Sequence, residues 1–183
     1  MKIHKILVCF LIVISSCTNK KEITTSTEEK TAVNEGVVNP EDIGKVVFEI
    51  IQDFEEMSIK DFEEKVITYQ ELQDLANNPK ARLGEQFKAD FKSITPAIYE
   101  QTMQNDYAGL KDASSKHEID WYKIQFVEFI HEEMEFDGVK GVQGETYFKN
   151  TDNKIYFIKS MAFYDGEKYV IVKMAEIQPS SKH

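Results

Sequence analysis

The stretch NTDNKIYFIKSMAFYDGEKY, residues 150–169, decides the fold class that the sequence predicts. Its centre, 155–164, is rich in aromatic and aliphatic residues, which favours a β-strand. Segments 150–153 and 165–167 on either side have turn compositions. Connections this short join only antiparallel neighbours, so strands at 142–149 and 169–177 should form a meander with it. A further strand is expected at 119–131.

The first half of the sequence predicts helices. Asn39-Pro40-Glu41-Asp42 is typical of a helix start, and apolar residues then recur at helical spacing from Ile43 to Phe54. Further helix starts are expected at Ser58, Thr68 and Thr95, because Ser and Thr side chains commonly cap the first turn of a helix. Helices followed by strands predict an α+β domain over residues 40–178, with N-terminal helices packed on one face of a curved four-stranded antiparallel sheet.

This order of elements, with aromatic strands such as Lys154-Ile155-Tyr156-Phe157-Ile158-Lys159, resembles the nuclear transport factor 2-like, SnoaL-like and cystatin-like α+β folds. The resemblance covers residues 40–177 and includes no diagnostic motif. It implies a curved sheet around the N-terminal helices, with a cone-shaped pocket between them. Members of these families include enzymes, ligand-binding proteins and assembly modules, so the fold alone does not select a function.

The N-terminus predicts export. Lys2 and Lys5 precede an apolar run at 6–14, which is much shorter than the roughly 20 residues of a transmembrane helix. The run ends at Ile14-Ser15-Ser16-Cys17, which resembles the lipobox of bacterial lipoproteins. This resemblance implies that residues 1–16 are a signal peptide and that lipid on Cys17 anchors the chain to a membrane. An ordinary signal peptide with an unrelated cysteine is the alternative.

The segments outside the domain have polar compositions. Residues 17–39 comprise the lipidated cysteine and a stretch too poor in apolar residues to fold alone, so we expect a flexible tether. Residues 179–183 are expected to be a disordered tail. The expected location is the bacterial cell envelope, at the outer membrane, because Thr18 is not the aspartate that retains many lipoproteins in the inner membrane.

Charge and cysteine content exclude several classes of function. The chain has a net charge of −10, and loss of Lys2 and Lys5 with the signal peptide makes it more acidic. Acidity argues against a nucleic-acid partner and against a basic membrane-binding patch. It favours either solubility or docking to a basic protein. With Cys9 removed and Cys17 lipidated, no thiol chemistry, disulfide or cysteine zinc site is expected.

Aromatic residues of the second half are the main candidates for a binding surface. In the strand at 155–164, both faces are apolar, so one face is expected to meet a small apolar ligand, an envelope protein or a second copy, unless its tyrosines simply cover the surface. The candidate binding residues are Trp121, Tyr122, Tyr147, Tyr156, Tyr164 and Tyr169.

Polar candidates are fewer. His117 and Asp120 would form an acid–base pair if both faced a pocket. Metal ligands on a strand would be spaced two residues apart, as His131, Glu133 and Glu135 are. We expect these side chains to be solvated, because the strand enters a loop there, and we predict no metal site. Glycine-rich phosphate loops and hydrolase elbows are absent from the sequence, and no cofactor is expected.

Three functional hypotheses follow. The first is a non-enzymatic, membrane-anchored lipoprotein whose domain binds a protein or a small ligand. The second is an acidic immunity- or inhibitor-like lipoprotein that neutralises a toxin or hydrolase. The third is a small SnoaL-like enzyme that uses His117 or Asp120 as its base.

Overall fold

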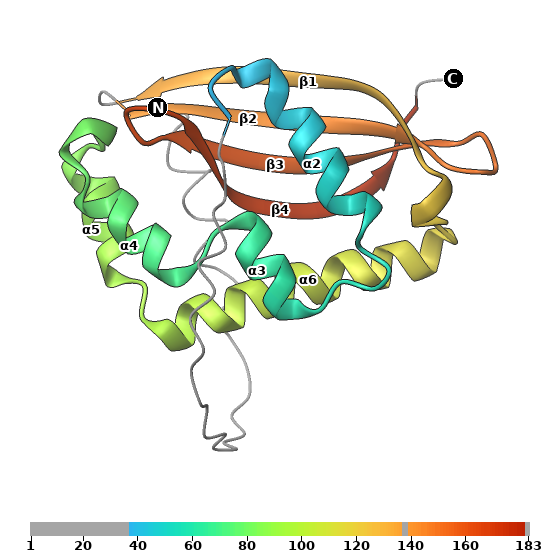
Figure 1. Ribbon diagram of the computed structural model, residues 1–183, viewed down its shortest axis with the longest axis horizontal. Coiled ribbons are helices and arrows are strands. Elements are labelled where there is room, and N and C mark those ends of the chain that lie inside the picture. The colour runs from blue at the N-terminus through green and yellow to red at the C-terminus, as the bar shows by residue number, and fades with distance from the viewer. Residues whose placement is uncertain (1–36, 137–138, 182–183) are drawn as a thin grey trace. The chain divides into compact units, whose positions relative to one another are not determined.

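The computed structural model describes residues 37–136 and 139–181, in which helices precede a four-stranded sheet (Figure 1). The helices are η1 Pro40–Asp42, α2 Ile43–Gln52, α3 Ile59–Val66, α4 Tyr69–Asn77, η2 Pro79–Ala81, α5 Glu85–Ser93, α6 Pro96–His117 and η3 Trp121–Lys123. The strands are β1 Gln125–Phe136, β2 Val139–Lys149, β3 Ile155–Tyr164 and β4 Tyr169–Pro179. This order confirms the predicted α+β class.

Side-chain caps begin the short helices where the sequence predicts. The Ser58 and Thr68 hydroxyls accept hydrogen bonds from the backbone amides of Asp61 and Glu71, whose carboxylates accept from the cap amides in return. Thr95 caps α6 in the same way, without the reciprocal bond. These bonds satisfy amides that would otherwise lack partners in the first turn, so each helix begins at a defined residue.

The sheet is a simple antiparallel meander with the order β1-β2-β3-β4. β1 differs from the prediction at both ends. Its start moves from 119 to Gln125, because the Asn150 side chain holds the preceding segment and residues 121–123 form a 3-10 turn. Its end extends to Phe136, so His131, Glu133 and Glu135 lie within a strand and not in a loop.

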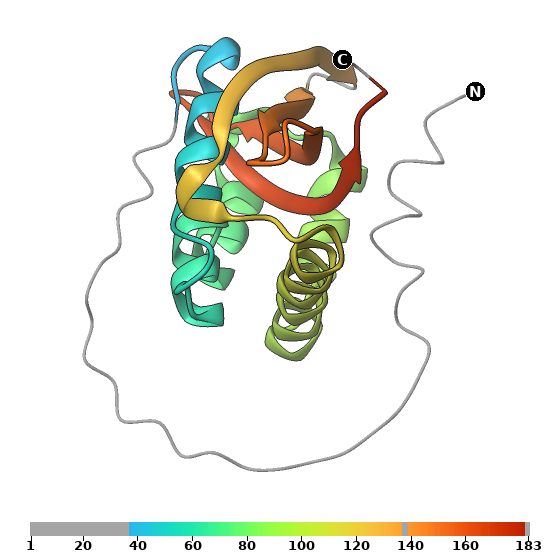
Figure 2. The ribbon, with the colours of Figure 1, turned by 90° about the vertical axis from the view of Figure 1, so that its right-hand side faces the viewer.

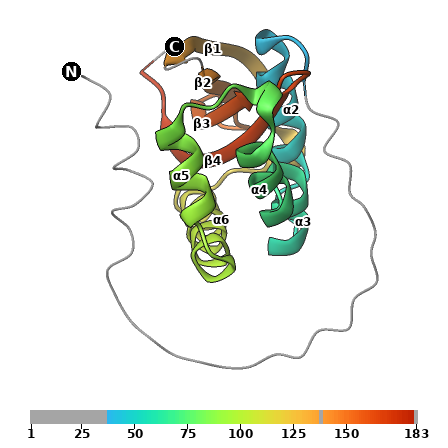
Figure 3. The same ribbon diagram turned by 90° about the vertical axis from the view of Figure 1, so that its left-hand side faces the viewer.

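One face of the sheet, the inner face, packs against helices. α2 crosses β1 and β2, and α6 lies along β4 (Figure 1, Figure 3). The inner-face residues Tyr156 and Ile158 of β3 are buried. Trp121 lies between Phe54 and Phe148, with ring centroids 5.6 and 5.8 Å away. The core therefore forms between the helices and this face.

The opposite face, which we call the outer face, is open over much of its area. The described helices leave it uncovered at β1 and β2 (Figure 2, Figure 3). In β3 it carries Ile155, Phe157 and Met161, which are half-buried. Near the end of β3, α5 covers Phe163, whose ring lies 5.7 Å from that of Phe87.

The two ends of the domain differ from the expected boundaries. β4 reaches Pro179, and the Ser180 amide donates to the Ile155 carbonyl at 2.8 Å, so the chain stays bonded where the tail was expected to begin. The predicted signal peptide, Cys17 and all of the predicted tether before residue 37 lie outside the described residues. Within residues 37–136 and 139–181, no helix has the length and apolar character needed to cross a membrane.

Candidate functional site

The aromatic residues predicted to share one surface are divided between several places. Trp121 and Tyr156 are buried in the core, so the prediction that they line a binding surface is wrong. Both rings pack near Phe148: Tyr156 lies on the face of the sheet that the helices cover, and Trp121 lies on η3. Tyr122 is exposed on η3, three residues before the first residue of β1 and in the same turn as the buried Trp121.

Tyr164 and Tyr169 form a separate pair at the β3–β4 turn. Their ring centroids are 5.2 Å apart. Tyr169 is buried, and its backbone exchanges two hydrogen bonds with Val37. Tyr169 therefore joins the start of the domain to β4, and this pair lies at the other end of β3 from Phe157, the cross-strand neighbour of Tyr147.

His117 and Asp120 do not form a pair over a cavity. The His117 ring lies 5.2 Å from the Tyr156 ring, at the end of α6. Asp120 accepts a hydrogen bond from the Lys123 ammonium group at 2.6 Å. Each side chain thus has a structural partner of its own, and neither lines the cavity described below.

His131, Glu133 and Glu135 alternate along β1 and lie opposite Gly144, Val142 and Lys140 of β2. The His131 ring stacks on that of Phe129 at 5.1 Å. Over residues 37–136 and 139–181, no group of three or more His, Cys, Asp or Glu side chains is placed to hold a metal ion.

An aromatic pair lies at the centre of the outer face, with Tyr147 buried and Phe157 half-buried. Tyr147 and Phe157 are paired across β2 and β3, with ring centroids 5.3 Å apart, and Tyr147 is only 7% exposed. The Tyr147 hydroxyl donates to the Glu145 carboxylate at 2.6 Å. This bond, with burial, raises the pKa of Tyr147 to about 12, because the carboxylate favours the protonated phenol. Beside them, Lys159 pairs with Glu176 at 2.6 Å.

β1 continues this surface to the edge of the sheet. Glu128 lies opposite Tyr147, and Ile130 lies opposite Glu145, so both belong to the outer face. Ile130 is 43% exposed on this face, and Val127, at the irregularity between Phe126 and Glu128, is 39% exposed. Phe126 is 38% exposed but lies opposite Phe148, on the inner face, where its ring is 5.5 Å from that of Phe48 on α2. Exposed apolar side chains therefore reach the β1 edge of the sheet.

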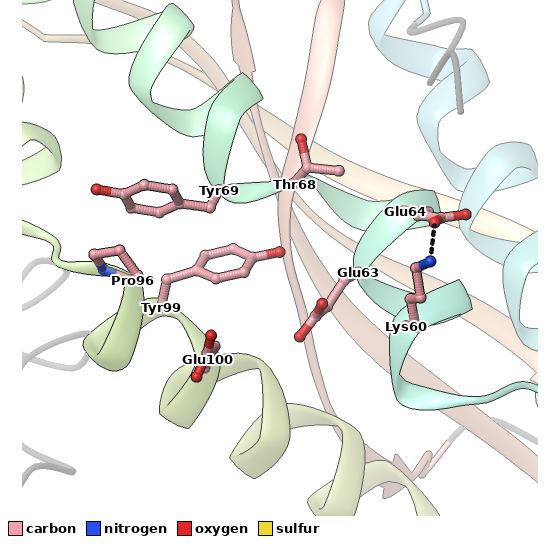
Figure 4. Close-up of a pocket in the computed structure, with 8 residues that line it drawn as sticks. All are labelled: Lys60, Glu63, Glu64, Thr68, Tyr69, Pro96, Tyr99 and Glu100. Carbon is pink, nitrogen blue, oxygen red and sulfur yellow. Dashed lines mark ion pairs between the residues drawn. The ribbon is translucent and has the colours of Figure 1, made fainter. Parts of the chain in front are cut away.

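A cavity of about 330 Å³ lies between α3, α4 and α6 (Figure 4). It is lined by Lys60, Glu63, Glu64, Thr68, Tyr69, Pro96, Tyr99 and Glu100. The Tyr99 hydroxyl donates to the Ile67 carbonyl at 2.6 Å. Burial raises the pKa of Glu63, and the negative charges of Glu100 and Glu64 raise it further.

Sequence reasoning missed both of these regions in part. The residues of the cavity come from three helices and share no local pattern. The sequence predicted a strand that contains Phe126, Val127 and Ile130. The alternation of apolar and polar residues along a strand does not show whether the strand lies at the edge of its sheet. The signal that would have identified the edge is the run of glutamates at 128, 132, 133 and 135, because edge strands often carry charges.

Comparisons with known proteins identify no relative. No protein-family model matches the chain, and no curated protein or solved structure is significantly similar to it. The resemblance to nuclear transport factor 2-like folds therefore stays a prediction.

Proposed function

We propose that this chain is a lipid-anchored protein of the bacterial cell envelope whose α+β domain binds another protein and has no catalytic role. One observation carries the proposal: large apolar side chains are exposed on edge strand β1, beside an outer sheet face that the described helices leave open. Soluble domains rarely expose adjacent large apolar residues unless these contact a partner.

A protein is a better candidate than a small apolar ligand. The exposed residues Phe126, Val127 and Ile130 lie along a strand edge, where a polypeptide makes both backbone and side-chain contacts. Four of the eight residues that line the cavity between α3, α4 and α6 are charged, and their loss of contact with water would oppose the binding of an apolar ligand.

The lipobox-like sequence supports the proposed location of the protein at a membrane. In the proposed mature form, lipid on Cys17 anchors the chain and the polar segment before Val37 joins it to the domain. Cys17→Ala is expected to move the protein from the membrane fraction to the soluble fraction while leaving the domain folded. Retention of the Cys17→Ala chain in the membrane fraction would contradict the anchor.

Binding can be tested by photo-crosslinking in native membranes. A photoreactive amino acid replaces Ile130 on β1 or, as the matched control, Gln104, which is exposed on α6. We expect a defined protein adduct from position 130 and little or none from position 104. Equal adducts from both positions, or none from position 130, would refute the proposed binding surface.

An immunity- or inhibitor-like role is the second candidate. Its support is the acidity of the same strand, since Glu132, Glu133 and Glu135 are exposed. Carboxylates at the rim of an interface accelerate association with a basic partner and are screened by salt. The adduct from position 130 should then fall sharply as the salt concentration rises before irradiation. An adduct that is indifferent to salt would favour apolar contacts instead.

A further inference from the structure

The two edge strands of the sheet, β1 and β4, differ in how far the rest of the chain covers them. At β4, α6 packs along the strand, and the backbone of Val37 pairs with that of Tyr169. β1 pairs with β2 on one side only, and within the described residues no other strand or backbone segment bonds to its free side. β1 also lies at the far side of the sheet from α6 (Figure 1, Figure 2).

A free edge of this length exposes a row of backbone N–H and C=O groups. β1 spans Gln125 to Phe136, and such a strand readily pairs with another extended chain. α2 contacts β1 through Phe126 and Phe129, which lie opposite the inner-face residues Phe148 and Thr146, so this helix packs on the inner face. The exposed apolar side chains of Val127 and Ile130 would add contact area to a paired chain.

The negative charge of β1 selects the kind of strand that can pair with its free edge. β1 carries Glu128, Glu132, Glu133 and Glu135, and it contains no lysine or arginine. Among the described residues, none forms an ion pair with Glu132, Glu133 or Glu135. A second copy of β1 would place carboxylates near carboxylates in either strand direction, and like charges across a strand pair are destabilising. A basic strand would instead pair with them favourably.

We infer that the β1 edge accepts an extended, basic segment of another protein, which adds a fifth strand to the sheet. This inference rests on the proposed protein-binding function and specifies the chemistry of the partner. The partner's residues opposite the four glutamates would be basic. Those opposite Phe129, Ile130 and Met134 would be apolar, with backbone hydrogen bonds holding the register.

A designed peptide tests this pattern. The antiparallel complement of residues 128–135 is Lys-Val-Lys-Lys-Thr-Val-Val-Lys, flanked by neutral caps. It is titrated into the full-length protein in neutral detergent. We expect binding at low salt, with slowed amide hydrogen exchange in residues 125–135 and unchanged exchange in β4. A peptide with every lysine replaced by glutamate should not bind.

Two matched controls separate strand addition from general attraction between opposite charges. Methylation of alternate peptide nitrogens keeps the charge and removes hydrogen bonds to the edge, so it should weaken binding at least tenfold. Glu132→Lys with Glu133→Lys should also weaken it at least tenfold. Glu55→Lys with Asp112→Lys changes the net charge equally at exposed sites outside the sheet, and should weaken it less than threefold.

Each contrary result overturns the inference. One such result is that the peptide does not bind, or that its affinity is unchanged by methylation or by the β1 substitutions. Another is that amide exchange is slowed at the cavity and not in β1, or that the wild-type protein pairs with a second copy of itself through β1. The methylated peptide keeps the test valid if the β1 double variant does not fold. If a crosslinked partner from position 130 is found but β1 amides exchange unchanged in its presence, the proposed function stands and strand addition fails.

Discussion

At the scale of single residues, Asn150 holds the connection between α6 and β1. Its side chain accepts a hydrogen bond from the Asp120 amide at 3.2 Å and donates one to the Glu118 carbonyl at 3.1 Å. Asn150 is buried. Asn150→Ala should therefore lower the free energy of unfolding by about 2 kcal/mol, because two backbone groups lose their partner.

Urea unfolding measures this effect, with Asn105→Ala as control. The Asn105 side chain accepts one hydrogen bond, from Gln101 on the exposed surface of α6. Its loss should change the unfolding free energy by less than about 0.5 kcal/mol. Similar losses for the two variants would mean that the Asn150 bonds add little beyond a surface contact.

At the scale of elements, the packing of α2 on β1 depends on a residue without a side chain. A Cβ atom at Gly44 would collide with the Phe129 side chain. Gly44→Ala should thus destabilise the protein by about 1–3 kcal/mol, although alanine is the better helix former. Gly109→Ala on α6 is the matched control, since its Cβ would meet no atom within 4 Å.

The Gly109→Ala variant should be more stable than the wild type by about 0.5–1 kcal/mol, because only the helix propensity changes. Thermal unfolding of the two variants therefore distinguishes them by sign. A stabilised Gly44→Ala variant would show that Phe129 does not pack closely on α2.

The contact between α6 and β4 predicts a dependence of stability on pH. Burial raises the pKa of Asp106 from 3.8 to about 6, although Lys173, 3.8 Å away, opposes the change, and Glu176 reinforces it. The folded protein then binds this proton more tightly than the unfolded chain, so its stability decreases as pH rises from about 4 to above 6.

Asp106→Asn removes this effect. Its unfolding free energy should exceed that of the wild type by about 3 kcal/mol at pH 7 and should nearly equal it at pH 4. Urea unfolding at both pH values checks the sign, and Asp112→Asn, exposed on the same helix, should show no such difference. An equal change at pH 4 and pH 7 would exclude titration of Asp106 as the cause.

At the scale of the whole molecule, the glutamates of β1 should keep the chain from associating with itself. Glu132→Gln, Glu133→Gln and Glu135→Gln together remove the charges that oppose pairing of two edges. We expect this triple variant to form dimers or larger species at concentrations where the wild type stays monomeric. Sedimentation velocity measures the difference.

Removal of three carboxylates elsewhere is the control for net charge. Glu49→Gln, Glu55→Gln and Asp112→Asn change exposed residues of α2, the following turn and α6. This control variant should stay monomeric. If both triple variants associate alike, net charge and not the β1 edge governs solubility.

Local chemistry made much of the fold predictable. Ser58 and Thr68 begin helices because each cap bonds to an amide three residues along the chain, a pattern visible in the sequence. The β2–β4 meander followed from short turns, which permit only antiparallel neighbours. The start of β1 was not predictable in this way, because Asn150, which holds the preceding segment, is 30 residues from Asp120.

By itself, then, the sequence determined the α+β class, the order of the elements and the alternation of the strands, since all three depend on near neighbours along the chain. Only the tertiary structure decided which apolar face is packed. It placed Tyr156 and Trp121 in the core, left β1 as an open edge and assembled the cavity from α3, α4 and α6. The physical reason is that burial depends on which distant segments pack together, and a residue's own neighbours do not encode this.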